Sequence, residues 1–328
     1  MSTPIDSQAT VWTDDPAGAS AMFRFSPNAK PVEIREPAWW SRLDAPGGCR
    51  GFAVADLLPG WPGPAGLGGF VARSGVSQYR VLRDLLAEGA DLGRPLVLVA
   101  GAGDNFEGQR GRAWSALEGN LHLSLALPCR LTAGPEALAL TALPAVAVQQ
   151  TLAHLGPGKE GPRPGIKWAN DVLLGSRKVA GVLTYARTRD GEINAVVYGI
   201  GVNVATVPDL PPSTFSPGAT SLARDWGPGR VPLAEVCRQL LTQLVRWYGT
   251  LHDEGSARVV EAYRAASSLT GLRVGIWPAE TPDAIDPAEV PPHREGVVRG
   301  IGSDLSLELE GQADKVRSGR LAILTQPG

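Results

Sequence analysis

Charged and polar side chains crowd into one otherwise apolar stretch of the chain, between residues 166 and 181. They are Lys167, Asn170, Asp171, Arg177 and Lys178. The apolar runs on either side of the turn at Gly175-Ser176 have the length of short strands. A lysine at the rim of an apolar sheet loses hydration, so it usually faces an anion. We therefore expect this stretch to bind a phosphate or a carboxylate.

Adenylation is the chemistry that suits these groups. In adenylation a carboxylate joins the α-phosphate of ATP and pyrophosphate leaves, so the protein positions two anions and neutralises growing negative charge. Lys167 and Lys178 would supply the positive charge. Asn170 or Asp171 would face a base, a Mg²⁺ ion or the incoming amine. A structural salt bridge from Asp171 to Lys167 or Arg177 is the alternative for that carboxylate.

A glycine- and arginine-rich segment, 101–114, lies between two predicted strands. It does not fit the dinucleotide pattern GxGxxG, and a strand rather than a helix follows it. We interpret it as a mobile loop that brings Arg110 and Arg112 over an anionic ligand, with Trp114 packed on a flat heterocycle. An ordinary solvated arginine loop is the alternative.

Small and polar residues also mark the predicted strands near this site. Gly181, Gly199 and Gly201 would let a ligand approach the backbone, although bends in a curved sheet need glycine too. Asn203 could orient a ligand group, but capping a turn is the more frequent role. The four histidines lie far apart and form no HxxxH pair, so we expect no protein-held metal. The chain has no GxSxG motif, which argues against a serine hydrolase.

Composition limits the classes of protein that fit. The formal net charge of −2 gives no general reason to bind nucleic acid. Cys49, Cys129 and Cys237 are far apart and lack metal-ligand spacing, so we expect reduced thiols in a cytoplasm. The chain starts without the basic and apolar segments of a signal peptide, and no apolar run is long enough to cross a membrane.

Strands and helices mixed along the chain must position these residues. The predicted strands of the main region are 70–72, 95–100, 120–127, 172–174, 179–183 and 193–204. The predicted helices are 78–88, 135–155, 232–252 and 256–267. The last three strands should form an antiparallel meander, because Asp190-Gly191 is a hairpin signal. Pro144 should kink or split the helix that contains it. Residues 205–230 should form a Pro-rich loop.

Composition also divides the chain into three regions. Residues 1–70 are rich in Pro and Gly and carry four tryptophans. They lack the three regular helices of a DNA-binding reader, so we expect a loop-rich N-terminal extension packed on the main domain. Residues 71–268 would form the catalytic domain. Residues 269–328 would form a small β module, with strands at 273–277, 294–301, 305–309 and 320–324.

Three motifs, in this order and spacing, resemble the biotin–protein ligase family. They are Lys167-Trp-Ala-Asn-Asp171, Arg177-Lys-Val-Ala-Gly181 and Gly199-Ile-Gly-Val-Asn203. The resemblance covers about residues 71–326. It implies an α+β fold, with a class II synthetase-like biotin/lipoate ligase domain built on a mixed, largely antiparallel sheet with flanking helices. It also implies that a small SH3-like β-barrel follows this domain.

The same resemblance implies a two-step reaction. Biotin and ATP, with Mg²⁺, give biotinyl-5′-AMP, and a lysine of the biotin carboxyl carrier domain of a carboxylase then takes the biotin. Lys178 would contact the biotin carboxylate and the phosphate, and Asp171 would help the acceptor lysine. Gly181, Gly199, Gly201 and Asn203 would lie at the ligand. The nucleotide would be bound by Arg110, Arg112, Trp114, Lys167 and Asn170.

The chain departs from the family pattern at two places. The Ser-Thr-Asn motif of the family is Gly75-Val76-Ser77 here, and Glu107 and Gln109 replace loop arginines that close over biotin and its adenylate. A lipoate or octanoate ligase or transferase on the same scaffold is therefore an alternative. A non-catalytic module that binds biotin or a carrier domain is another. The sequence does not fix the oligomeric state, and a homodimer stays open.

Overall fold

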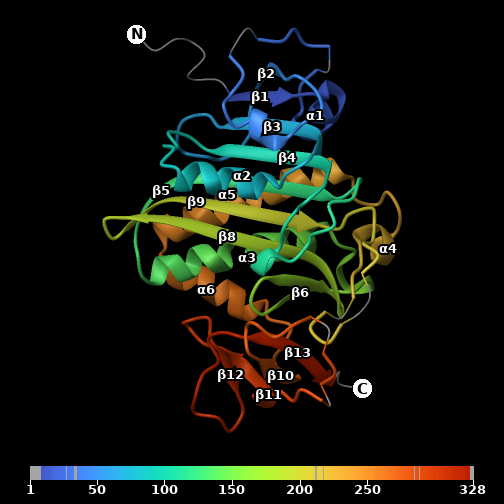
Figure 1. Cartoon of the computed structure of the whole chain (residues 1–328), viewed down its shortest axis with the longest axis vertical. Coiled ribbons are helices and arrows are strands. Elements are labelled where there is room, and N and C mark those ends of the chain that lie inside the picture. Colours follow the sequence, from blue (N-terminus) through green and yellow to red (C-terminus); the bar gives the residue numbers. More distant parts are fainter. Residues whose placement is uncertain are drawn as a thin grey trace.

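A nine-stranded mixed sheet runs through the larger domain (Figure 1). The computed structural model describes residues 9–26, 28–32, 35–210, 213–216, 218–283, 285–287 and 289–325. The strand order is β2-β1-β3-β4-β5-β9-β8-β7-β6. The strands are β1 (Ala9–Thr13), β2 (Arg50–Val54), β3 (Leu67–Ser74), β4 (Leu96–Gly103), β5 (Leu121–Thr132), β6 (Pro164–Lys167), β7 (Asp171–Leu174), β8 (Arg177–Arg189) and β9 (Glu192–Val202).

The sheet is largely antiparallel, as the sequence predicts. Strand β3 pairs in parallel with β1 and β4, and the other neighbouring pairs are antiparallel. The predicted meander is confirmed as β7, β8 and β9. Asp190 and Gly191 join β8 to β9 with φ values of 52° and 80°. A tight two-residue hairpin turn requires a positive φ at both of its central residues.

Helices cover both faces of the sheet and create two hydrophobic cores (Figure 1). Helix α3 (Pro135–Leu155) packs on one face together with α5 (Leu233–Asp253) and α6 (Ser256–Ala265), and α2 (Gln78–Ala87) packs on the other. Side chains alternate along a strand, so Leu123 of β5 faces α3 while Ala126 faces α2. By length and composition α3 could span a membrane, but it is mostly buried, as a core helix is.

Two predictions about these elements need correction. Helix α3 continues through Pro144 as one element, so the predicted split is wrong. Its neighbours α5 and α6 bury the helix and stabilise it more than a lost backbone hydrogen bond weakens it. The loop predicted for 205–230 contains a short helix, α4 (Leu222–Trp226), and Ser221 caps it by accepting a hydrogen bond from the N–H of Arg224.

The N-terminal region is not a separate extension of the larger domain. Strands β1 and β2 extend the main sheet beyond β3, which itself begins at Leu67, so no boundary lies at residue 70. The described part of 9–70 contains one α-helix, α1 (Pro16–Phe23), which contacts α5. Both strands have only five residues, and most of these are buried, so neither strand shows the polar and apolar alternation that identifies a strand in a sequence.

A second sheet forms the C-terminal module at the far end of the molecule (Figure 1). Its order is β12-β11-β10-β13, and every neighbouring pair is antiparallel. The strands are β10 (Arg273–Trp277), β11 (Arg294–Ile301), β12 (Leu307–Leu309) and β13 (Arg320–Thr325). The predicted strands of this module are confirmed. Trp277 is fully buried and meets Phe215 of the larger domain edge-on, with ring centroids 5.3 Å apart.

Candidate functional site

Three neighbouring strands form the floor of a cavity on the face of the sheet that α2 covers. Residues paired across strands share a face. The floor residues are His122 and Ser124 of β5, Gly199 and Gly201 of β9, and Gly181 and Leu183 of β8. Glycine is common here because bulky side chains lie directly above the sheet. The Tyr79 ring lies over Gly199 and the Trp114 ring lies over Gly201.

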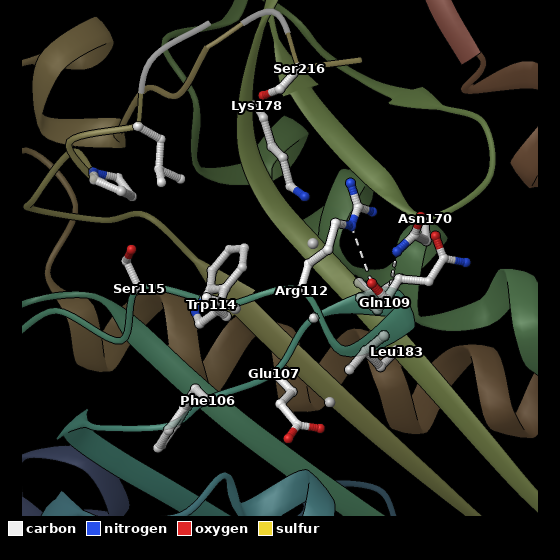
Figure 2. A pocket seen from close by; sticks show the side chains of 18 of the residues that line it. Phe106, Glu107, Gln109, Arg112, Trp114, Ser115, Asn170, Lys178, Leu183 and Ser216 are labelled. Carbon is white, nitrogen blue, oxygen red and sulfur yellow. Dashed lines mark hydrogen bonds between the residues drawn. The ribbon is translucent and has the colours of Figure 1, made fainter. Parts of the chain in front are cut away.

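The cavity above this floor has a volume of about 1090 Å³. Its wall is formed by the N-terminus of α2, by residues of the loop 106–115, by Pro208, Leu210, Ser213, Thr214, Ser216 and Ala219, and by Asp283, Ile285 and Asp286 of the C-terminal module. Figure 2 shows Phe106 and Glu107 on one side and Lys178 on the other, with Trp114 and Arg112 between them. We call the first side, formed by Ser77, Gln78, Tyr79, Phe106 and Glu107, the α2 end. The other side, formed by Asn170, Lys178, Gly181 and Asn203, is the lysine end.

Lys178 and Asp171 form an ion pair at the lysine end. The Lys178 Nζ lies 2.6 Å from Asp171 Oδ1, and both side chains are mostly buried. Burial by itself would raise the pKa of Asp171, but the Lys178 and Lys167 ammonium groups hold it below the usual value. The predicted salt bridge of Asp171 therefore exists with a different partner, since Arg177 pairs with Asp225 at 2.8 Å. Lys178 Nζ also lies 5.6 Å from the Trp114 ring centroid.

Lys167 faces a second, smaller hollow of about 170 Å³ beside the main cavity. Gln109, Arg112 and Asn170 line both spaces. Lys167 is 5% exposed, and its Nζ donates a hydrogen bond to the Phe215 carbonyl oxygen at 2.9 Å. Burial lowers the pKa of Lys167 to about 8, although Asp171 acts in the opposite direction. The two lysines therefore flank one carboxylate and face adjoining spaces.

Arginines from distant parts of the chain surround the smaller hollow. They are Arg110, Arg112, Arg317 and Arg320. Arg110 donates to the carbonyl oxygens of Ala279 at 2.7 Å and Gly319 at 3.4 Å, so it ties the loop to the C-terminal module. Burial, with the neighbouring arginines, lowers the pKa of Arg110. This concentration of positive charge around a small space suits a polyphosphate.

The side chain of Trp114 is fixed by a histidine in the floor. His122 Nε2 lies 3.0 Å from the Leu117 carbonyl oxygen, and Trp114 Nε1 lies 3.4 Å from His122 Nδ1. Burial lowers the pKa of His122, which favours the neutral ring that donates at Nε2 and accepts at Nδ1. The ring of Trp114 therefore has a fixed position over Gly201.

Replacing Gly201 with alanine should reduce activity without unfolding the sheet. The new Cβ would lie 2.2 Å from Trp114 Cζ2, so the indole would move and lose its contact with Lys178. We expect KM for the substrates to rise and turnover to fall about tenfold or more, because small displacements of positioning groups cost rate steeply. The matched control is Gly300→Ala in β11, where a Cβ meets nothing within 4 Å. Equal steady-state kinetics for Gly201→Ala and Gly300→Ala would contradict this role.

Asn170 and Asn203 hold backbone segments at the lysine end. Asn170 Nδ2 donates to the Val182 carbonyl oxygen at 3.0 Å, and Asn203 Nδ2 donates to the Thr220 carbonyl oxygen at 3.0 Å. Asn203 therefore ties the end of β9 to a segment 17 residues further along the chain, and this bond is not the local turn cap that was predicted. Its Oδ1 is buried, has no hydrogen-bond partner among the described residues and belongs to a residue that lines the cavity. Asn203 can therefore also accept a hydrogen bond from a ligand.

Several residues at the site were not identified from the sequence. They are Gln78 of the α2 end, Asp283 and Ile285 of the C-terminal module, Arg317, which precedes β13, and Arg320, which begins it. Arg320 pairs with Asp283 and lies over the Phe215 ring, 3.9 Å from its centroid. The close spacing of Arg317 and Arg320 in the sequence is the signal that could have identified them as site residues. Their approach to the larger domain depends on tertiary contacts.

The chain is similar to known proteins over the segment that contains most of the floor of the cavity. The model of the biotin/lipoate A/B protein ligase family matches residues 98–203. A biotin–[acetyl-CoA-carboxylase] ligase of Paracoccus denitrificans is 36% identical over 169 residues, covering 50% of this chain and 67% of that protein. One from Mycobacterium tuberculosis is 30% identical over 254 residues, covering 74% and 84%.

Among solved structures, the fold resembles that of the biotin protein ligase from Aquifex aeolicus in complex with biotin and ATP. The TM-score is 0.57 at 19% sequence identity, and the match covers 79% of this chain and 99% of the other. The predicted fold class, a biotin/lipoate ligase domain with a small C-terminal β module, is confirmed. The chain belongs to the biotin–[acetyl-CoA-carboxylase] ligase family.

Proposed function

We propose that the chain is an ATP-dependent biotin–protein ligase that makes biotinyl-5′-AMP and transfers biotin to a lysine of a biotin carboxyl carrier domain. The Lys178–Asp171 pair carries this proposal, because it places a cation at the wall of a ligand-sized cavity beside a hollow of arginines. Membership of the family supports it. The Aquifex aeolicus structure of similar fold holds biotin and ATP.

In the first step a biotin carboxylate oxygen forms a bond to the α-phosphorus of ATP, and the bond from that phosphorus to pyrophosphate breaks. Lys178 would attract both the carboxylate and the α-phosphate, which repel each other. Lys167, Arg112 and Arg320 would neutralise the departing phosphates in the smaller hollow. The fixed indole of Trp114 would lie against the adenine. These roles remain predictions for each residue.

In the second step the acceptor lysine attacks the acyl carbon of biotinyl-5′-AMP and AMP leaves. Free lysine has a pKa of about 10.4, so the amine must lose a proton before it reacts. The pKa of Asp171 is below its usual value, which keeps this carboxylate ionised at neutral pH. Asp171 would therefore accept a hydrogen bond from the incoming amine and orient it towards the acyl carbon.

Mg²⁺ is part of the proposal through the nucleotide. Among the described residues, no cluster of three or more His, Cys, Asp or Glu could hold a metal. Mg²⁺ commonly binds through one or two carboxylates together with substrate phosphates, and Asp171 is the carboxylate among the described residues that line the smaller hollow. The ion would neutralise phosphate charge when it is bound with ATP.

Biotin-dependent exchange of labelled pyrophosphate into ATP tests the proposal on the purified full-length chain. We expect exchange that requires both biotin and Mg²⁺. Exchange supported by octanoate or lipoate in place of biotin would identify the lipoate alternative. Tight biotin binding without exchange would identify the non-catalytic module, and either result would refute the ligase assignment.

The affinity for ATP should weaken as pH rises through about 8. The pKa of Lys167 is lowered to about 8, so in the free protein this lysine loses its charge above that pH. A neutral amine no longer attracts phosphate, and KM for ATP should rise about tenfold for each pH unit well above 8. Lys167→Arg stays charged, so its KM should stay flat from pH 8 to 9.5. The same rise in both proteins would assign the pH effect to another group.

Cellular location, partners and oligomeric state are also part of the proposal. We propose a cytoplasmic location, since the three cysteines are free thiols. We propose a carrier domain as the protein partner and no nucleic-acid partner. A homodimer stays open, and sedimentation of the purified chain would decide it.

A further inference from the structure

Gln78 is a buried residue in the wall of the main cavity, and its side chain has an unused hydrogen-bond donor. It is the first residue of α2, is 1% exposed and lines the α2 end. Its Nε2 has no hydrogen-bond partner among the described residues. Buried polar groups are almost always paired, so an unpaired amide in a ligand cavity is a candidate ligand contact.

The surroundings of Gln78 favour an uncharged oxygen on that ligand. The first N–H groups of a helix lack intrahelical partners and carry a partial positive charge. Ser77, the N-cap residue of α2, does not cap the helix with its hydroxyl. The charged side chain that lines the α2 end is Glu107, held by Arg80 at 3.3 Å. A carboxylate there repels an anion, whereas a neutral carbonyl oxygen could accept from Gln78.

The same charges fix the direction in which a carboxylic acid lies. Its carboxylate is attracted to Lys178 at the lysine end and repelled by Glu107 at the α2 end. Gly199 and Gly201 lie two residues apart in β9, under Tyr79 and Trp114 respectively. The floor therefore leads from the α2 end to the lysine end, and Figure 2 shows Glu107 and Lys178 on opposite sides of the cavity.

We propose that Gln78 is a specificity-determining residue that donates a hydrogen bond from Nε2 to an uncharged carbonyl oxygen at the ring end of the acid. This inference rests on the proposed function, in which that oxygen is the ureido oxygen of biotin. Glu107 occupies a loop position where the family pattern has an arginine. The neutral amide of Gln78 would therefore bind the ring of biotin in place of that arginine. An acid without a carbonyl at its far end gains nothing from Gln78.

Gln78→Met tests the proposal, because methionine keeps the volume and removes the amide. In biotin-dependent pyrophosphate exchange, KM for biotin should rise about tenfold to a hundredfold, with kcat and KM for ATP within about twofold of the unmodified protein. Gln78→Glu keeps the shape but loses the donor, and it should weaken biotin at least as much. Calorimetric binding of biotin without ATP should show the same loss of affinity.

Octanoate provides the second readout, because it has a carboxylate but no carbonyl at its far end. Gln78→Met should leave octanoate affinity unchanged, so the preference for biotin should fall by the same factor as biotin affinity. An equal loss for both acids would indicate a structural role and overturn the proposal, as would an unchanged KM for biotin. Gln312→Met, in the C-terminal module, is the matched control.

The two proposals can fail separately. If the unmodified protein uses biotin and Gln78→Met uses it equally well, only the role of Gln78 is refuted. If the unmodified protein binds octanoate but shows neither binding of biotin nor exchange with it, the ligase assignment and the role of Gln78 both fail. The thermal midpoint of Gln78→Met should be no lower than that of the unmodified protein, because Nε2 has no partner to lose.

Discussion

Lys178→Ala is expected to lower biotin-dependent pyrophosphate exchange by about two to three orders of magnitude. The ammonium group lies 2.6 Å from Asp171 in a mostly buried setting and is placed where two anions must meet. Without it, the biotin carboxylate and the α-phosphate repel each other with less compensation. Both kcat and kcat/KM should fall, because the missing attraction increases as charge develops in the transition state.

Lost stability and lost catalysis would both lower the exchange rate, so this experiment must measure stability as well as exchange. Lys178→Ala leaves the Asp171 carboxylate without its closest cation, which lowers stability. The double variant Lys178→Ala/Asp171→Asn removes that buried charge, so it should recover stability but not exchange. Lys315→Ala is the control, since that lysine pairs with Glu308 in the C-terminal module, 3.1 Å away. Normal exchange in a folded Lys178→Ala protein would remove this lysine from the mechanism.

Asn120→Ala is expected to lower the free energy of unfolding by about 3–5 kcal/mol. Asn120 is fully buried, and its Oδ1 accepts hydrogen bonds from the N–H groups of Val204, Ala205 and Thr206 at 2.9, 3.1 and 3.0 Å. Its Nδ2 donates to the Thr206 carbonyl oxygen at 2.8 Å. Alanine would leave several backbone groups unpaired where β9 leaves the sheet.

Urea denaturation followed by circular dichroism measures this loss. Asn194→Ala in β9 is the matched control, because that side chain accepts a single hydrogen bond, from Arg187 Nε, and its loss should cost about 1 kcal/mol. The Asn120 variant should also bind substrates more weakly, since the turn it holds follows Asn203. A loss no larger than that of Asn194→Ala would show that the three N–H groups find other partners.

The part of the site that is local in sequence could be predicted from sequence. The strands β8 and β9 follow from their apolar runs and the Asp190-Gly191 turn, and antiparallel pairing then brings Gly181 beside Gly201. The motif spacing further places Lys178 and Asp171 at the ends of paired strands. In the structure Asp171 lies opposite Gly181 and Lys178 lies opposite Leu173, and the two charged side chains meet at 2.6 Å.

The partner of Asp171 could not be predicted in the same way. Lys167, Arg177 and Lys178 lie within eleven positions of one another in the sequence. Side-chain direction decides which of them reaches the carboxylate, and Asp225 of α4 draws Arg177 away. Asp225 lies far along the chain in a helix of five residues, which is too short to show a helical pattern.

The sequence by itself determined the fold class, the family motifs and the type of reaction. Each of these depends on residues close together in the chain or on a short turn between strands. Tertiary structure alone decided that β1 and β2 belong to the main sheet, that Arg320 and Asp283 of the C-terminal module reach the site, and that Gln78 leaves an unused donor at the cavity wall. These features join segments that lie far apart in the sequence or depend on one rotamer at a helix end. Their free energies come from burial and charge in the assembled molecule, and local sequence patterns do not encode them.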